Sequence, residues 1–202
     1  RKPSKVLQLR AGMALFKIPA FKKAAIGYFG HMWELYAFWA FIPFAIKTYN
    51  SIHISHLPFS LWTFSIIGLG GISCAIGGHF ALRWGSRKVA LISLLLSGVL
   101  CIASPLFFLL PSYLFLLAFC LWGMFVVSDS PQFSTLVASA VPLELKGTAL
   151  TLVNCIGFSI SIISIQLLTY WLEVVDSSYI FTVLSIGPIL GIWALRKGGL
   201  NK

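Results

Sequence analysis

The stretch from Val89 to Ser128 reads VALISLLLSGVLCIASPLFFLLPSYLFLLAFCLWGMFVVS and contains no formal charge. A helix that crosses the hydrocarbon of a bilayer needs roughly 20 apolar residues, so this stretch is long enough for two helices. Pro111 and Ser112 lie near its middle, and this pair is typical of a turn. The stretch therefore predicts two transmembrane helices, over 89–109 and 112–140, and with them a membrane protein.

Four more apolar stretches surround this pair, each bounded by charges or turn residues. We expect further spans over 24–46, 59–82, 147–172 and 179–195. A β-barrel, the other fold that can span a bilayer, would alternate apolar and polar residues, whereas these stretches are continuously apolar. The predicted fold class is therefore all-α, a polytopic transmembrane six-helix bundle within residues 24–196.

The composition favours a membrane protein over a soluble one. The chain is 58% hydrophobic and 10% charged, against roughly 45 to 50% and about 25% in soluble domains. A water-soluble fold of this length would lack the polar residues to cover its surface. The four cysteines lie singly in apolar runs without zinc-ligand spacing, so we expect buried thiols and no metal or other cofactor.

The 15 Lys and Arg residues outnumber the five Asp and Glu residues, and they gather in particular segments. They precede the first span, separate the second from the third and the fourth from the fifth, and follow the sixth, whereas only Lys47 lies on the opposite side. Short basic loops stay in the cytoplasm, so both termini are predicted there. The excess charge then indicates anionic membrane lipid, and not nucleic acid, as a partner.

The basic segment 1–23 is predicted to lie at the inner membrane surface. Four of its apolar residues recur at helical spacing: Val6, Leu9, Met13 and Phe16. They suit a short interfacial helix that ends near Pro19, and a flexible basic linker suits the segment equally. The chain begins with Arg1 and not with Met, so we expect a linker from an upstream segment, and residues 197–202 are expected to form a cytoplasmic tail.

Two acids lie inside the predicted spans, where an ionised side chain costs roughly 2.5 to 3.5 kcal/mol to insert. Glu34 lies three residues after His31 in the first helix, so both point to the same side. Their face is mixed polar and aromatic, with Gly27, His31, Glu34, Phe38 and Phe41. It suits a water-filled pathway, in which a carboxylate beside an imidazole carries a proton, binds a cationic group or orients a substrate. The alternative is a His–Glu hydrogen bond that only joins two helices, and one H-x-x-E pair supplies too few ligands for a metal.

Asp129 is the second acid, in the segment Ser128-Asp129-Ser130-Pro131-Gln132. Pro131 removes a backbone donor and predicts a kink in the fourth span beside the carboxylate, which serves either as a hinge or as a static bend. In the fifth span, polar and small residues share a stripe that lines a cavity or, more commonly, packs on a neighbour: Asn154, Gly157, Ser161 and Ser164.

With these residues in view, the chain resembles the C-terminal six-helix half of a major facilitator superfamily transporter. Residues 78–88, GHFALRWGSRK, are similar to the family's G-x-x-x-D-R-x-G-R-[RK] loop, and residues 142–149, PLELKGTA, are similar to its P-x-x-x-R-G-x-A element. Residues 30–36, GHMWELY, resemble the seventh helix of a bacterial subgroup related to nitrate, nitrite and cyanate porters. Leu82 departs from the family at the acidic position of the loop, which puts the charge contact of that loop in doubt.

The resemblance implies two inverted three-helix repeats, an N-terminal six-helix half as partner, and a substrate bound between the halves. It places the first and fourth helices at the cavity. Together with the residues above, it makes these the candidates for substrate binding or proton coupling: His31, Glu34, Phe38, Asp129, Gln132 and Asn154. The candidates for conformational gating are Gly78, Arg83, Gly85, Arg87, Lys146 and Gly147.

The leading functional hypothesis is proton-coupled secondary transport of a small solute, an anion or small metabolite, by alternating access. The alternative is a non-transporting membrane scaffold or assembly subunit whose acids are structural. An intramembrane enzyme is not expected, because the chain lacks paired aspartates with a glycine turn, G-x-S-x-G and H-E-x-x-H.

Overall fold

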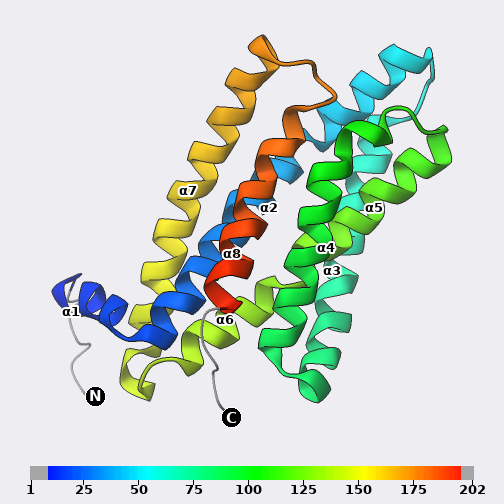
Figure 1. The fold of residues 1–202 in the computed structure, drawn as a ribbon. Helices are drawn as coiled ribbons and strands as arrows, with labels where there is room; N and C mark the ends of the chain where they lie inside the picture. Colours follow the sequence, from blue (N-terminus) through cyan, green and yellow to red (C-terminus); the bar gives the residue numbers. More distant parts are fainter. Residues whose placement is uncertain (1–8, 197–202) are drawn as a thin grey trace.

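The computed structural model describes residues 9–196, and this part of the chain consists of helices and the turns between them, with no strand (Figure 1). The helices are α1 (Leu9–Ala14), η1 (Leu15–Lys17), α2 (Pro19–His53), α3 (Phe59–Trp84), α4 (Ser86–Phe107), α5 (Ser112–Ser128), α6 (Ser130–Ser139), η2 (Leu143–Leu145), α7 (Lys146–Val174), η3 (Ile180–Ser185) and α8 (Ile186–Arg196). Val6 and the bases Arg1, Lys2 and Lys5 lie outside the described residues, as does the expected tail 197–202. The predicted all-α class is confirmed.

Four helical segments are long and apolar enough to cross a membrane. They are Phe59–Trp84, Ser86–Phe107, Ser112–Ser139 and Leu143–Val174. These segments identify an all-helical membrane protein, and they correspond to four of the six expected spans.

The first and sixth expected spans are not among these four long apolar segments. The helix α2 has 35 residues and extends the expected span 24–46 at both ends, but it carries His31 and Glu34 and is not among the four apolar segments. It packs on α8, α7, α6 and α3, so its polar residues can face other helices. The sixth expected span begins as the 3-10 helix η3, which leaves α8 with 11 residues.

The fourth expected span, 112–140, is two helices and not one. The helix α5 ends at Ser128, α6 begins at Ser130, and Asp129 lies in a turn between them. Pro131 lies in the first turn of α6, where the missing backbone N–H would have had no partner within the helix. The helix is therefore interrupted beside the carboxylate, at the place where the proline predicted a kink.

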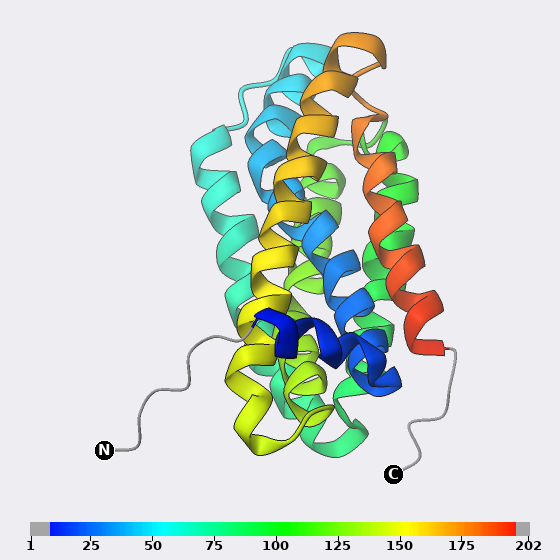
Figure 2. The same ribbon diagram turned by 90° about the vertical axis from the view of Figure 1, so that its left-hand side faces the viewer.

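One packing pattern occurs twice in the bundle (Figures 1 and 2). The helix α3 packs extensively on α5, and α7 packs extensively on α2. A serine forms an equivalent interhelical hydrogen bond in each pair. Ser73 Oγ on α3 donates to the carbonyl oxygen of Met124 on α5 over 2.7 Å, and Ser161 Oγ on α7 donates to that of Met32 on α2 over 2.8 Å. Two pairs of helices from different parts of the chain thus share one mode of contact.

Glycine contacts and aromatic packing hold the middle of α2 inside the bundle. At Gly30 of α2 and Gly187 of α8 the two backbones touch, because a Cβ atom on either glycine would collide with the carbonyl oxygen of the other. Further along α2, the ring of Phe38 lies 4.6 Å from that of Trp122, which in turn lies 5.6 Å from Phe181 of η3. The buried residues His31 and Glu34 of α2 lie between these two contact regions in the sequence.

The segment before α2 lies across the bundle at the end where α2 begins and α8 ends (Figure 2). Residues 9–17 are helical, which favours the short interfacial helix over the flexible linker in the described part of this segment. The ring of Phe16 packs edge-on against Phe21 at 5.2 Å, whereas Met13 is 62% exposed. One side of this short helical segment is therefore attached to the bundle and another is exposed.

Candidate functional site

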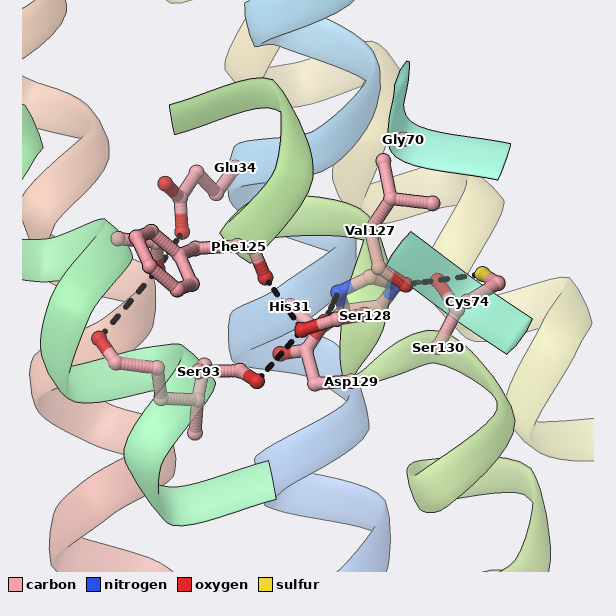
Figure 3. Close-up of polar contacts among 12 residues, drawn as sticks. His31, Glu34, Gly70, Cys74, Ser93, Phe125, Val127, Ser128, Asp129 and Ser130 are labelled. Carbon is pink, nitrogen blue, oxygen red and sulfur yellow. Dashed lines mark hydrogen bonds and ion pairs between the residues drawn. The ribbon is translucent and has the colours of Figure 1, made fainter. Parts of the chain in front are cut away.

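Three ionisable side chains lie together in the interior of the bundle: His31 and Glu34 of α2, and Asp129 of the turn between α5 and α6 (Figure 3). We call them the central polar cluster. Their exposed fractions are 2%, 1% and 1%, respectively. Burial of this kind removes a charge from water, so each group needs a partner inside the protein.

Each ring nitrogen of His31 has a polar atom close to it. Its Nδ1 lies 2.9 Å from Oδ1 of Asp129, and its Nε2 lies 2.8 Å from Oγ of Ser130. A hydroxyl group both donates and accepts, so Ser130 donates to a neutral imidazole and accepts from an imidazolium. The site can therefore hold His31 in either charge state without moving a side chain. Both partners come from the helix break, because Asp129 lies in the turn between α5 and α6 and Ser130 is the first residue of α6.

Glu34 accepts hydrogen bonds from three donors on two neighbouring helices. Its Oε1 accepts from Trp122 Nε1 over 2.7 Å and from the Cys101 thiol over 3.2 Å, and its Oε2 accepts from Ser97 Oγ over 3.0 Å. Three donors suit an ionised carboxylate.

The same site can also accommodate a protonated Glu34. Ser97 Oγ lies 3.3 Å from the carbonyl oxygen of Leu94, one turn earlier in α4. A proton on Oε2 can be donated to Ser97 while Ser97 turns its own hydrogen to Leu94. Protonation then requires only the rotation of one hydroxyl group.

The sequence predicted that His31 and Glu34 would act as a pair, and the structure divides them between different partners. His31 is paired with Asp129, and Glu34 is bonded to α4 and α5. The face of α2 that was expected to line a water-filled pathway packs on α5 and α6, and a Cβ atom at Gly27 would lie 2.5 Å from Phe133.

The other sequence candidates lie in different surroundings. Phe38 is fully buried in the aromatic packing, stacked on Phe119 at 6.2 Å. Gln132 is buried in α6, one turn after Asp129. Asn154 lies on an exposed position of α7 and accepts a hydrogen bond from the Tyr28 hydroxyl over 2.8 Å, so it is not part of the central polar cluster.

A cavity of about 200 Å³ lies between α3, α4 and α5. Its polar lining includes Ser93 and Ser128, whose hydroxyl oxygens lie 2.6 Å apart (Figure 3). Ser128 is the residue before Asp129, so this cavity reaches to within one residue of the ion pair. Most of the remaining lining is apolar, including Ile76, Phe80 and Ile92.

Five of the six candidate gating residues lie at or near the turns that join α3 to α4 and α6 to α7. Gly85 ends α3 with a φ of 81°, a backbone conformation that favours glycine. Arg87 donates from Nη2 to the carbonyl oxygen of Leu195 over 2.6 Å, which links this turn to the end of α8. The remaining four do not form a common site: Gly78 lies within α3, Arg83 is exposed near its end, and Lys146 and Gly147 begin α7.

The sequence analysis missed the residues that bind Glu34. A signal for two of them was present, because Ser97 and Cys101 are one turn apart in an otherwise apolar helix and so share a face. Trp122 carried no such signal, since it lies in an uninterrupted apolar run. The described residues contain no group of three or more His, Cys, Asp or Glu side chains that could hold a metal ion.

Comparison of the chain with models of protein families, with curated proteins and with solved structures found no match.

Proposed function

We propose that this chain is one six-helix half of a secondary transporter, equivalent to the C-terminal half of a major facilitator carrier. It moves a small solute, an anion or small metabolite, by alternating access, in partnership with a second six-helix half. The observation that carries the proposal is the central polar cluster, with three ionisable groups buried together in a bundle of membrane-crossing helices. Ionisable residues inside a membrane commonly mark pathways for ions or protons.

The hydrogen bonds around the cluster suit proton coupling. His31 and Glu34 each have a hydroxyl partner that can reverse its role, so each can hold or release a proton within its present packing. Asp129 lies at a helix break, so a change in the charge of His31 would act directly beside the interruption of the helix. If this break serves as a hinge, protonation and bending occur at the same position.

The duplicated packing supports a pair of inverted repeats, with α2 to α4 as the first repeat and α5 to α8 as the second. In this assignment, the second helix of each repeat packs on the first helix of the other, through Ser73 and Ser161. Glu34 lies on the first helix of the first repeat, and Asp129 lies in the turn between α5 and α6, which together form the first span of the second repeat. Such repeats are a common construction of secondary transporters.

The topology that fits this proposal has both termini in the cytoplasm of a bacterial inner membrane. The start of α2 and the end of α8 lie at the same end of the bundle (Figures 1 and 2). The bases Lys22, Lys23, Arg87 and Arg196 belong to this end, so the positive-inside rule assigns it to the cytoplasm.

The test is transport by the complete protein in sealed vesicles, with a pH gradient and a screen of small anions, amino acids and sugars. Glu34→Gln keeps the shape of the side chain and removes its titration, so we expect uptake to lose its dependence on the pH gradient. Ser159→Ala is the matched control, because Ser159 is exposed on α7 and bonds only to its own helix. Uptake by Glu34→Gln with unchanged rate and pH dependence would contradict the coupling role.

A scaffold or assembly subunit is the second candidate, and one surface favours it. The helix α3 presents an open face on which added Cβ atoms at Gly68 and Gly71 meet nothing within 4 Å, beside the exposed Phe64 and Ile72. Small residues on a membrane helix allow a partner helix to approach closely. A scaffold predicts that Glu34 and Asp129 substitutions impair assembly with that partner and that no solute moves.

A further inference from the structure

A groove lies where α2 begins and α8 ends, at the base of the bundle. Its volume is about 220 Å³, and its lining residues are Pro19, Lys22, Lys23, Ile26, Trp193 and Ala194. We call it the basic groove. It does not include any residue of the central polar cluster or of the turns that join α3 to α4 and α6 to α7.

The groove combines cationic and apolar chemistry. Two lysines of α2 line it, and no carboxylate lines it among residues 9–196. The indole of Trp193 and the side chain of Ile26 supply apolar surface beside the two ammonium groups. One turn further along α2, Gly30 touches the backbone of Gly187, so the two helices that form the groove are held together as a unit.

An apolar stripe leads away from the groove along the outside of α8. It consists of exposed side chains at helical spacing: Ile186 (45% exposed), Ile189 (56%), Leu190 (50%) and Trp193 (51%). On a membrane protein, a stripe of this kind meets hydrocarbon or another helix. Its last member, Trp193, also lines the basic groove, so the cationic and apolar surfaces are continuous.

From this arrangement we propose that the basic groove binds the phosphate of an anionic phospholipid, with the acyl chains along the apolar stripe of α8. Lysine ammonium groups bind phosphate as point charges, and basic pockets at the membrane surface hold anionic headgroups. Tryptophan favours the headgroup level of a bilayer, because its ring is apolar and its N–H is polar. A free phosphate ion would contact the lysines alone, whereas the acyl chains of a lipid would also cover the exposed apolar stripe of α8, so the geometry favours the lipid.

The inference depends on the membrane location of the chain and not on transport, so the two can fail separately. The test is retention of phosphatidylglycerol, compared with neutral phosphatidylcholine, by the complete protein purified in mild detergent and examined by native mass spectrometry. A lysine near a charged membrane surface changes binding about fivefold, so we expect Lys22→Gln/Lys23→Gln to reduce retention of phosphatidylglycerol by roughly 25-fold. Retention of phosphatidylcholine should not change.

The matched control is Lys47→Gln/Lys88→Gln, which removes the same charge from residues that do not line the groove. We expect this variant to retain phosphatidylglycerol as the wild type does. Equal losses in the two double variants would overturn the site, since they would indicate a general effect of net charge. Unchanged retention after the Lys22 and Lys23 substitutions would overturn it as well.

A third variant separates a lipid from a free phosphate. Trp193→Ala should weaken binding of phosphatidylglycerol, because the indole and part of the apolar stripe are lost, and should leave the affinity for inorganic phosphate unchanged. If inorganic phosphate at millimolar concentration displaces the lipid and Trp193→Ala has no effect on either ligand, the groove is a free-phosphate site and the lipid assignment is wrong. The helical circular dichroism of each variant confirms that it is folded.

Discussion

Replacement of Glu34 gives the sharpest test of the interior hydrogen bonds. Two substitutions with different chemistry are expected to lower the free energy of unfolding by clearly different amounts. In Glu34→Gln, the amide oxygen can keep the bonds from Trp122 and Cys101, and the amide nitrogen can donate to Ser97, whose hydroxyl then turns to Leu94. In Glu34→Ala, all three donors lose their acceptor. If the charge of Glu34, and not its hydrogen bonds, stabilised the protein, the two variants would lower stability equally, because both remove that charge.

The magnitudes follow from the bonds themselves. Interhelical hydrogen bonds in membrane proteins average about 0.6 kcal/mol, so three of them amount to about 2 kcal/mol. An unsatisfied buried donor at Trp122 adds about 1 to 3 kcal/mol. We therefore expect the free energy of unfolding to fall by about 3 to 5 kcal/mol in Glu34→Ala and by less than about 1 kcal/mol in Glu34→Gln.

The assay is unfolding in mixed micelles with increasing dodecyl sulfate, followed by helical circular dichroism. Trp122→Phe completes a double-mutant cycle, because it removes the donor that Glu34→Ala leaves unpaired. In the Glu34→Ala background, Trp122→Phe should cost less than it does alone. Equal destabilisation by Glu34→Gln and Glu34→Ala, or strict additivity of Glu34→Ala and Trp122→Phe, would refute the hydrogen-bond network described for Glu34.

Three further changes have defined outcomes in the same assay. His31→Gln and Asp129→Asn should be non-additive by about 0.5 to 3 kcal/mol, because the 2.9 Å contact joins them directly; additive effects would mean that they are not paired. Gly30→Ala should destabilise the protein by about 1 to 3 kcal/mol through collision with the backbone of α8, whereas Gly68→Ala, which meets nothing within 4 Å, should change stability by less than about 0.5 kcal/mol. Ser161→Ala should cost about 0.6 kcal/mol through loss of its bond to α2, and a neutral result would argue against that contact.

Much of the fold was predictable because it depends on local features of the chain. Long apolar runs predict membrane-crossing helices wherever they occur, and four of the expected spans are segments of this kind. The helix break at Asp129 was predictable for a similar reason, since Pro131 removes a backbone donor whatever surrounds it. Glu34 and Asp129 were chosen as candidates because a charge inside an apolar helix is costly.

The less accurate expectations concerned elements whose length or direction depends on neighbours. The first span was expected to end at residue 46, and α2 continues to His53, where the His53 ring nitrogen Nε2 lies 2.7 Å from the carbonyl oxygen of Phe108. The sixth span was expected to be a continuous helix, and it begins as η3. Hydropathy depends only on the composition of a segment, so it cannot predict where contacts with other helices extend or interrupt a helix.

The sequence alone determined the class of protein, the approximate spans, the bend in the fourth span and the three ionisable residues of the interior. Each of these depends on a residue and its near neighbours, through hydrophobicity, helical periodicity or the chemistry of proline. Only the tertiary structure decided that His31 pairs with Asp129, that Ser97, Cys101 and Trp122 bind Glu34, and that the lysines of α2 share a groove with Trp193. These partners lie more than 60 residues apart in the chain and meet because the glycine and aromatic contacts of α2 bring the helices together at one particular rotation.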